Sequence, residues 1–121
     1  MLSKGLAYEK VALKFLLKRG LKQIQTNYHT RFGEIDLIMK DDSTIIFVEV
    51  RFRSSDSYGS AEESISPSKQ RKIIKSAQFY LNQYKLWEND IRFDVITITP
   101  SKLNFTRDKI NWYESAFTPE N

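Results

Sequence analysis

The chain has 121 residues, of which 40% are hydrophobic and 28% charged, and it contains no cysteine. This composition excludes a disordered polypeptide, a disulfide scaffold and a thiolate metal site, and the length suits one domain, residues 1–121, with a core of its own. Lys and Arg outnumber Asp and Glu by 19 to 15, so the net charge is +4, a modest excess whose placement matters more than its size.

Hydrophobic runs are short throughout the chain. The longest uninterrupted run, Ile45 to Val48, is far too short to cross a bilayer. The first four residues lead directly into an amphipathic pattern, so we expect no secretory signal. Together with the lack of cysteine, these features predict a cytoplasmic protein with no membrane partner.

The first half of the chain predicts one helix and three strands. Helical periodicity covers residues 3–19 and ends at Gly20, which suits the C′ position after a helix. Period-2 patterns and a polar turn follow, with strands at residues 21–28, 33–39 and 44–53 and the turn at residues 40–43.

The second half predicts another helix and strand. Residues 54–60 form a loop in which Tyr58 and Gly59 look like a turn anchor, and Ser66 and Pro67 then supply the N-cap and N1 of a long helix that ends at about Tyr84. A strand covers residues 91–99, and the segment after Pro100 is apolar but ambiguous in type. The order α-β-β-β-α-β plus a tail predicts an α/β fold with a mixed β-sheet flanked by helices.

Two neighbouring strands each carry a carboxylate near the middle, Asp36 and Glu49. Alternation places Glu34, Asp36 and Ile38 on one face of the first strand and Ile35, Leu37 and Met39 on the other. A turn centred on residues 41–42 would set Asp36 opposite Phe47, and one centred on residues 42–43 would set it opposite Glu49.

Either register leaves the carboxylates of Asp36 and Glu49 within about 5–8 Å of each other. Carboxylates at that separation repel unless a positive group lies between them. A divalent cation, Mg²⁺ or Mn²⁺, is the economical candidate because both prefer oxygen ligands. The alternative is that the two acids form ion pairs with Arg51, Arg53 or Arg31 on a solvated sheet face.

The first predicted helix carries a third acid in an apolar setting. Its apolar face contains Leu6, Ala12, Leu13 and Leu16, and Glu9 falls in the middle of it. A buried carboxylate is costly, so we expect Glu9 to be paired, hydrogen-bonded or near a metal. The alternative is a carboxylate near a helix end that fraying exposes.

Several segments together resemble a known family. In chain order they are GLAYEKVA (residues 5–12), NYHTRFGEIDLI (27–38), FVEVRFR (47–53), YGSAEESI (58–65), SKQRKI (68–73) and RFDVITI (92–98). This ordered set resembles the YraN-like family of bacterial proteins, which is described as endonuclease-like, and it covers nearly the whole chain. Glu9, Asp36 and the run from Glu49 to Arg51 also resemble the PD-(D/E)xK core, and the chain is similar to archaeal Holliday-junction resolvases.

The resemblance implies a restriction-endonuclease-like core and a metal-dependent DNA endonuclease, with selectivity for branched DNA in repair or recombination. It implies Mg²⁺ or Mn²⁺ held by Asp36, Glu49 and the Val50 carbonyl, with Glu9 bound directly or through water. Arg51 occupies the position of the usual lysine; because arginine is always protonated, it can stabilise charge but cannot act as a general base. This departure leaves open a non-catalytic nucleic-acid-binding or repair-accessory protein.

The first turns of the second predicted helix are rich in Lys and Arg, which predicts a basic surface beside the acids. Cations near a helix N-terminus oppose the helix dipole, so their position suggests use in phosphate binding rather than a gain in stability. The resemblance adds Gln70, which is expected to reach the metal-bound water or a phosphate. The predicted DNA-binding residues are Arg53, Lys69, Arg71, Lys72 and Lys75. The alternative for this run is a solvated helix face.

Other residues receive a structural interpretation. Asp94 and Arg92 are expected to pair on a sheet face and His29 to lie at the surface. Packing is the expected role of Trp87, Trp112 and Tyr113, and base stacking is the alternative, which nothing in their spacing requires. A glycosidase-like carboxylate pair is disfavoured because the neighbouring groups are cationic. DNA is the expected nucleic acid, and homodimerisation stays open because junction-resolving relatives act as dimers.

Overall fold

The α/β fold expected from the sequence is confirmed in the computed structural model, which describes residues 4–53, 65–101 and 108–119. The predicted loop at residues 54–60 lies outside the described residues. The ambiguous tail contributes a strand. The elements are α1 (Lys4–Lys18), β1 (Lys22–Thr30), β2 (Gly33–Asp41), β3 (Thr44–Phe52), α3 (Pro67–Gln83), β4 (Ile91–Thr99) and β5 (Lys109–Phe117).

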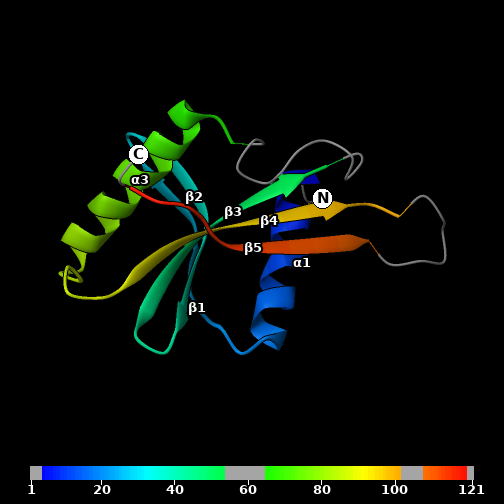
Figure 1. Cartoon of the computed structure of the whole chain (residues 1–121), viewed down its shortest axis with the longest axis horizontal. Helices are drawn as coiled ribbons and strands as arrows, with labels where there is room; N and C mark the ends of the chain where they lie inside the picture. The colour runs from blue at the N-terminus through cyan, green and yellow to red at the C-terminus, as the bar shows by residue number, and fades with distance from the viewer. Residues whose placement is uncertain (1–3, 54–64, 102–107, 120–121) are drawn as a thin grey trace.

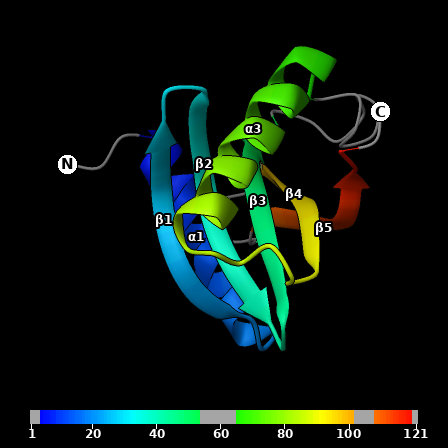
Figure 2. The same ribbon diagram turned by 90° about the vertical axis from the view of Figure 1, so that its left-hand side faces the viewer.

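The strands form one mixed sheet in the order β1-β2-β3-β4-β5. Strands β3 and β4 pair in parallel, and the other neighbours pair antiparallel. Helix α1 covers one face of this sheet and α3 the opposite face (Figures 1 and 2). The predicted mixed sheet flanked by helices is therefore confirmed.

Both predicted helix boundaries follow from local hydrogen bonding. Gly20 has φ of 91°, and beyond it the N–H of Leu21 donates to the Leu16 carbonyl at 3.2 Å, which closes the end of α1. Before α3, the Ser66 hydroxyl accepts a bond from the Lys69 N–H at 3.1 Å. Neither described helix is long and apolar enough to cross a membrane.

Each helix buries a separate cluster of apolar side chains against the sheet. On the α3 side, Tyr80 packs edge-on against Phe47, and Phe47 stacks on Phe93. On the α1 side, Ala12 and Leu16 pack on strand residues that have 0–1% exposure, namely Leu37, Met39, Ile46, Val48, Ile96 and Ile98. The core therefore has two layers, with Asp36 and Glu49 in the strands between them.

The prediction that Ile35, Leu37 and Met39 share one face of β2 is wrong for Ile35. Leu37 and Met39 pack on the α1 side, whereas Ile35 belongs to the cluster on the α3 side together with Ile38. The ladder with β3 ends at Leu37, whereas the ladder with β1 continues to Gly33. The outer part of β2 therefore leaves β3, and simple alternation fails across Asp36.

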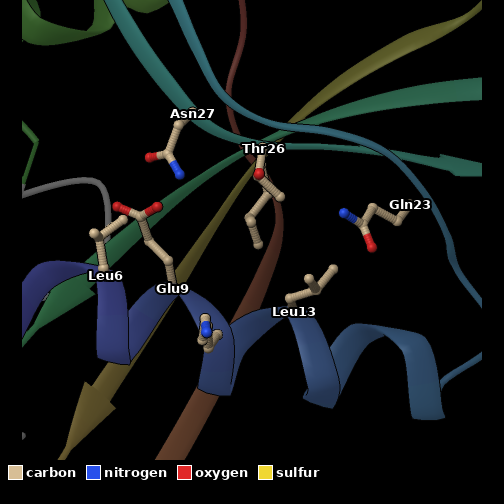
Figure 3. A pocket seen from close by; sticks show the side chains of 8 residues that line it. Leu6, Glu9, Leu13, Gln23, Thr26 and Asn27 are labelled. Atoms are coloured by element: carbon tan, nitrogen blue, oxygen red, sulfur yellow. The ribbon is translucent and has the colours of Figure 1, made fainter. Parts of the chain in front are cut away.

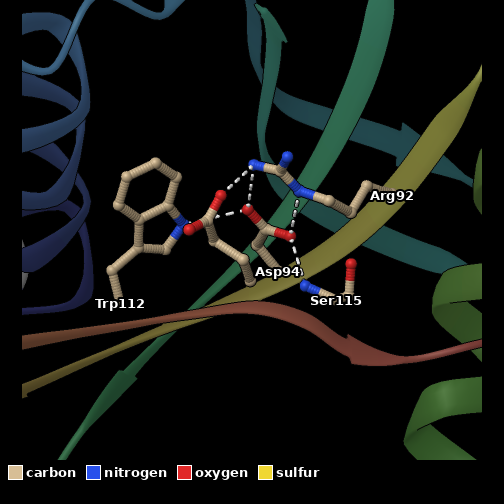
Figure 4. A network of polar contacts seen from close by, with 5 residues as sticks. Arg92, Asp94, Trp112 and Ser115 are labelled. Carbon is tan, nitrogen blue, oxygen red and sulfur yellow. Dashed lines mark hydrogen bonds and ion pairs between the residues drawn. The ribbon is translucent and has the colours of Figure 1, made fainter.

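The predicted pair of Arg92 and Asp94 is confirmed and belongs to a larger network (Figure 4). Asp94 has 0% exposure, and its two oxygens accept bonds from two Arg92 nitrogens, the Trp112 indole and the Ser115 N–H, each at 2.9 Å. Arg92 also contacts Glu114 at 3.1 Å. The network ties β4 to a bulge in β5, where Ser115 has φ of 52°.

The three aromatic residues that we expected to pack differ in how far they are exposed. Trp112 packs edge-on against Phe15 at a centroid distance of 6.3 Å, as expected. Trp87 is 62% exposed and Tyr113 37% exposed, so the packing prediction is wrong for both. Trp87 follows α3, where nothing in the local pattern distinguishes a surface indole from a buried one. His29 is exposed, as predicted, and lies 3.5 Å from Glu34.

Candidate functional site

The hairpin register places Asp36 beside Glu49. Asp41 pairs with Thr44, so residues 42–43 form the turn, and continuing this register beyond Leu37 and Val48 sets Asp36 against Glu49. The Val50 N–H donates to Asp36 Oδ2 at 2.9 Å. The Asp36 carboxylate thus accepts a main-chain bond at the point where β2 leaves β3, which fixes its position.

Glu49 lies in the interior rather than on a solvated face. Only 6% of the residue is exposed, and burial raises the pKa of its carboxyl to about 9, helped by the hydrogen bond and the charge of Asp36. The raised pKa favours the protonated form of Glu49, whose carboxyl group can donate a hydrogen bond to Asp36. The solvated-face alternative is therefore wrong for Glu49, although the ion pair with Arg51 that it included is present.

Two cations flank Glu49. Arg51 Nη2 lies 3.6 Å and Lys69 Nζ 3.7 Å from Glu49 Oε2, and both side chains are a little over one third exposed. Arg51 Nε is buried without a hydrogen-bond partner among the described residues. The sequence pattern assigned Lys69 only to the basic helix surface. It gave no sign that the first turn of α3 brings this ammonium group to the carboxylate pair.

Glu9 lines a pocket of about 350 Å³ on the α1 side of the sheet. Figure 3 shows its carboxyl group pointing toward the side chain of Asn27. Burial, and then the charges of Asp36 and Glu34, raise the Glu9 pKa to about 7, while a hydrogen bond from Asn27 opposes the shift. Asn27 has φ of 51° and was not singled out from the sequence. The pocket is lined by Leu6, Glu9, Lys10, Leu13, Gln23, Thr26, Asn27 and Leu37.

The residues of this site fit a hard divalent cation held by few protein ligands. Glu49 Oε2 is buried without a hydrogen-bond partner among the described residues, and it adjoins a second carboxylate that could share a cation. No group of three or more His, Cys, Asp or Glu suited to a metal occurs in the described part of the chain. Mg²⁺ is commonly held by one or two carboxylates, water and substrate phosphate, which matches such a site. Direct ligation by Glu9 or by the Val50 carbonyl stays a prediction.

The remaining predicted residues lie around the start of α3. Gln70 Nε2 donates to the Ile65 carbonyl at 2.9 Å, so this amide group holds the residues that precede α3 against its first turn. Arg71, Lys72 and Lys75 are exposed, and Arg53 is half-buried. The structure therefore brings Asp36, Glu49, Arg51 and Lys69 together, with the other basic side chains beside them.

Replacing Glu49 by glutamine is expected to make stability less dependent on pH. The folded carboxyl has a pKa of about 9 against an ordinary value of 4.5, so its contribution to stability is full below about pH 4.5 and is lost as the pH rises toward 9. Because glutamine cannot ionise, and each pH unit between the two pKa values is worth about 1.4 kcal/mol, the variant should gain roughly 4 kcal/mol relative to the wild type between about pH 5.5 and pH 8.5. Urea unfolding in EDTA at the two pH values measures the difference.

The control for this measurement is Glu88→Gln, which alters an exposed glutamate in the turn before β4. It should leave the pH dependence of the wild type unchanged. Equal pH dependence of unfolding in the wild type and in Glu49→Gln would contradict a buried carboxyl that keeps its proton.

Comparisons with known proteins agree with one another. A family model described as "Uncharacterised protein family UPF0102" matches residues 8–98, a span that includes every candidate site residue. A UPF0102 protein of Vibrio parahaemolyticus is 46% identical over 115 residues, covering 94% of this chain and 91% of the relative. One of Nitrosococcus oceani is 44% identical over 118 residues, covering 97% and 93%. One of Legionella pneumophila is 43% identical over 115 residues, covering 94% and 93%.

Proposed function

This chain belongs to the uncharacterised protein family UPF0102, the YraN-like family, and we propose that it is a metal-dependent endonuclease that hydrolyses phosphodiester bonds in DNA. The observation that carries the proposal is the buried contact of Asp36 with Glu49 beside Arg51 and Lys69. Selectivity for branched DNA in repair or recombination is part of the proposal and rests on the similarity to junction resolvases.

The carboxylate pair supports the proposal because its burial is costly without a function. Burial, then the hydrogen bond and the charge of Asp36, raise the pKa of Glu49 to about 9, so the fold holds this carboxyl group where its ionised form is disfavoured. Strongly perturbed carboxyl groups of this kind concentrate at functional sites. A divalent cation could take the place of the Glu49 proton, because it would offset the repulsion between the two ionised carboxylates and bind both.

The residues of the site divide the chemistry of phosphodiester hydrolysis among them. Asp36 and Glu49 would hold Mg²⁺ or Mn²⁺, which supplies Lewis-acid stabilisation of the phosphate and activation of water. The Arg51 side chain is about one third exposed beside Glu49, and its guanidinium group could donate to a phosphate oxygen. Lys69 supplies a second cation beside Glu49, with an ammonium group that could donate a hydrogen bond to a phosphate oxygen or to a bound water.

A second candidate function is nucleic-acid binding without catalysis, as in a repair-accessory protein that keeps the nuclease fold. Arg51 favours it, because this residue stands where the resembling nucleases have lysine. Lys69 favours the enzyme, because its Nζ lies 3.7 Å from Glu49 Oε2 and a lysine is therefore present at this carboxylate although position 51 is arginine. An Arg51→Lys variant separates the two: a gain of cleavage would identify a weak enzyme, and binding without cleavage would favour the accessory role.

Metal-dependent cleavage is the expected result that tests the proposal. The purified chain is incubated with labelled single-stranded, duplex, flap and four-way-junction DNA in Mg²⁺ or Mn²⁺, and the products are resolved on denaturing gels. Cleavage should appear with either ion, stop in EDTA and return when the ion is restored. Salt-sensitive binding without cleavage of any substrate would contradict the enzyme and favour the accessory role. The absence of binding at low salt would contradict both functions.

A further inference from the structure

A second pocket, of about 420 Å³, lies between the β1–β2 turn and the outer side of α3. It is separate from the carboxylate pair and from the Glu9 pocket. Its walls combine two aromatic rings, two cations and two amide side chains. The lining residues are Arg31, Phe32, Lys75, Gln78, Phe79 and Asn82.

The aromatic rings and the cations of this pocket form one surface. The Arg31 guanidinium lies 5.0 Å and the Lys75 ammonium 5.7 Å from the centre of the Phe32 ring. Phe79 is 46% exposed and lines the same pocket. Asn82 accepts a hydrogen bond from the indole of Trp87, which adds a further exposed ring beside the pocket. Exposed rings among cations and amides suit a flat ligand that carries negative charge and polar edges.

The pocket is held in shape by contacts between the turn and the helix. Thr30 Oγ1 lies 2.8 Å from Ser76 Oγ, and Thr30 Oγ1 also accepts a hydrogen bond from the Phe32 N–H at 3.0 Å. Gly33, with φ of 145°, continues the turn at a position where a Cβ would lie 3.9 Å from the Lys72 Cβ. The turn thus rests directly on α3, and the rings are positioned before any ligand arrives.

One flank of α3 connects this pocket with the candidate nuclease site. Lys69 contacts Glu49 at the start of the helix, Lys72 and Lys75 follow at three-residue steps, and Phe79 comes one turn later. At 1.5 Å per residue, Lys69 and Phe79 are about 15 Å apart along the helix axis. That is the span of a few nucleotides, with cations along its length.

We propose that the pocket of Phe32 and Phe79 stacks an unpaired base of the DNA strand whose phosphate occupies the carboxylate site. The proposal rests on the proposed function and gives it a substrate class: DNA with single-stranded nucleotides a few positions from the cleaved bond. Base faces are available only where bases are unpaired, and aromatic side chains beside cations bind them without regard to sequence. In intact duplex DNA the same surface meets phosphates alone.

Binding measurements in EDTA test the pocket separately from catalysis. Two fluorescein-labelled probes are compared by anisotropy, a ten-residue oligothymidine and an abasic deoxyribose-phosphate chain of the same length and charge. Phe79→Ala should weaken binding of the oligothymidine about tenfold and leave the abasic probe within about twofold. Phe79→Trp should bind the oligothymidine at least as tightly as the wild type.

The controls separate base stacking from charge and from loss of structure. Tyr113→Ala removes a comparably exposed ring from β5 and should change neither affinity. Lys75→Ala should weaken both probes by a similar factor because it removes a phosphate contact. Thermal unfolding confirms that each variant is folded. A Phe79→Ala variant that weakens both probes equally, or neither, would overturn the base-stacking pocket.

These outcomes are distinct from those of the cleavage test. Because the probes are bound in EDTA, a protein that never cleaves DNA can still show the difference between the two probes. A protein that cleaves DNA but shows no difference retains the proposed function and loses the pocket.

Discussion

Asp36→Asn is expected to reduce metal-dependent cleavage by about 100-fold or more while leaving the fold and DNA binding intact. Changes to residues around metal ligands cost about 10–100-fold, so loss of a ligand should reach at least the upper end of that range. Asparagine keeps the shape of aspartate and an oxygen that can accept the bond from the Val50 N–H. It removes the negative charge of Asp36, which would bind the cation together with Glu49. Rates of cleavage on the preferred substrate, with Mg²⁺ titrated, measure the effect.

The matched control is Asp41→Asn, which makes the same change at the exposed end of β2. It should cleave at the wild-type rate, because the side chain lies beside the turn and away from the carboxylate pair. Wild-type cleavage by Asp36→Asn would contradict the assigned site and would point to a contaminating nuclease. Loss of DNA binding in this variant would contradict the separation of binding from chemistry.

Asp94→Ala is expected to lower the free energy of unfolding by about 3–5 kcal/mol, the usual cost of removing one partner of a buried ion pair. Alanine leaves the Arg92 guanidinium, the Trp112 indole and the Ser115 N–H without the acceptor that they share. Because small domains are stable by only about 5–15 kcal/mol, the variant should approach the limit of folding. Urea unfolding at neutral pH gives the difference directly.

Asp90→Ala is the control for this loss, since Asp90 is an exposed aspartate immediately before the same strand. We expect a change within about 0.5 kcal/mol, as for an ordinary surface position. A similar small change in Asp94→Ala would contradict the role of the network in joining β4 to the bulge of β5. Asp94→Asn removes the negative charge but keeps the shape and one oxygen acceptor. The part of the loss that this variant shares with Asp94→Ala therefore measures the contribution of the charge.

The elements that could be predicted from sequence are those with local signals. Gly20 and Ser66 mark helix ends through bonds within a few residues, and the structure confirms both. Strand β5 could not be assigned because the bulge at Ser115 interrupts alternation and leaves Ala116 and Phe117 as consecutive buried residues. The sequence pattern is therefore least informative where a strand changes the face that it buries.

The same physical reason limits prediction of the candidate site. The hairpin left two registers open, and the short turn selected the one that sets Asp36 against Glu49. Alternation could not show that Ile35 faces α3, because β2 leaves β3 at this point. The contact of Lys69 with Glu49 depends on how α3 docks on the sheet, which no local periodicity specifies. The acids could therefore be found from the sequence, whereas the role of Lys69 could not.

The parallel pairing of β3 with β4 bears on the order in which the molecule assembles. Antiparallel hairpins such as β2–β3 close over a few residues, whereas a parallel pair must first enclose the long connection that contains α3, at a larger entropic cost. Asp36 and Glu49 lie in the early hairpin, and Lys69 arrives with the later crossover. During folding the two acids therefore meet before Lys69 reaches them, so the carboxylate pair gains this cation only when α3 docks.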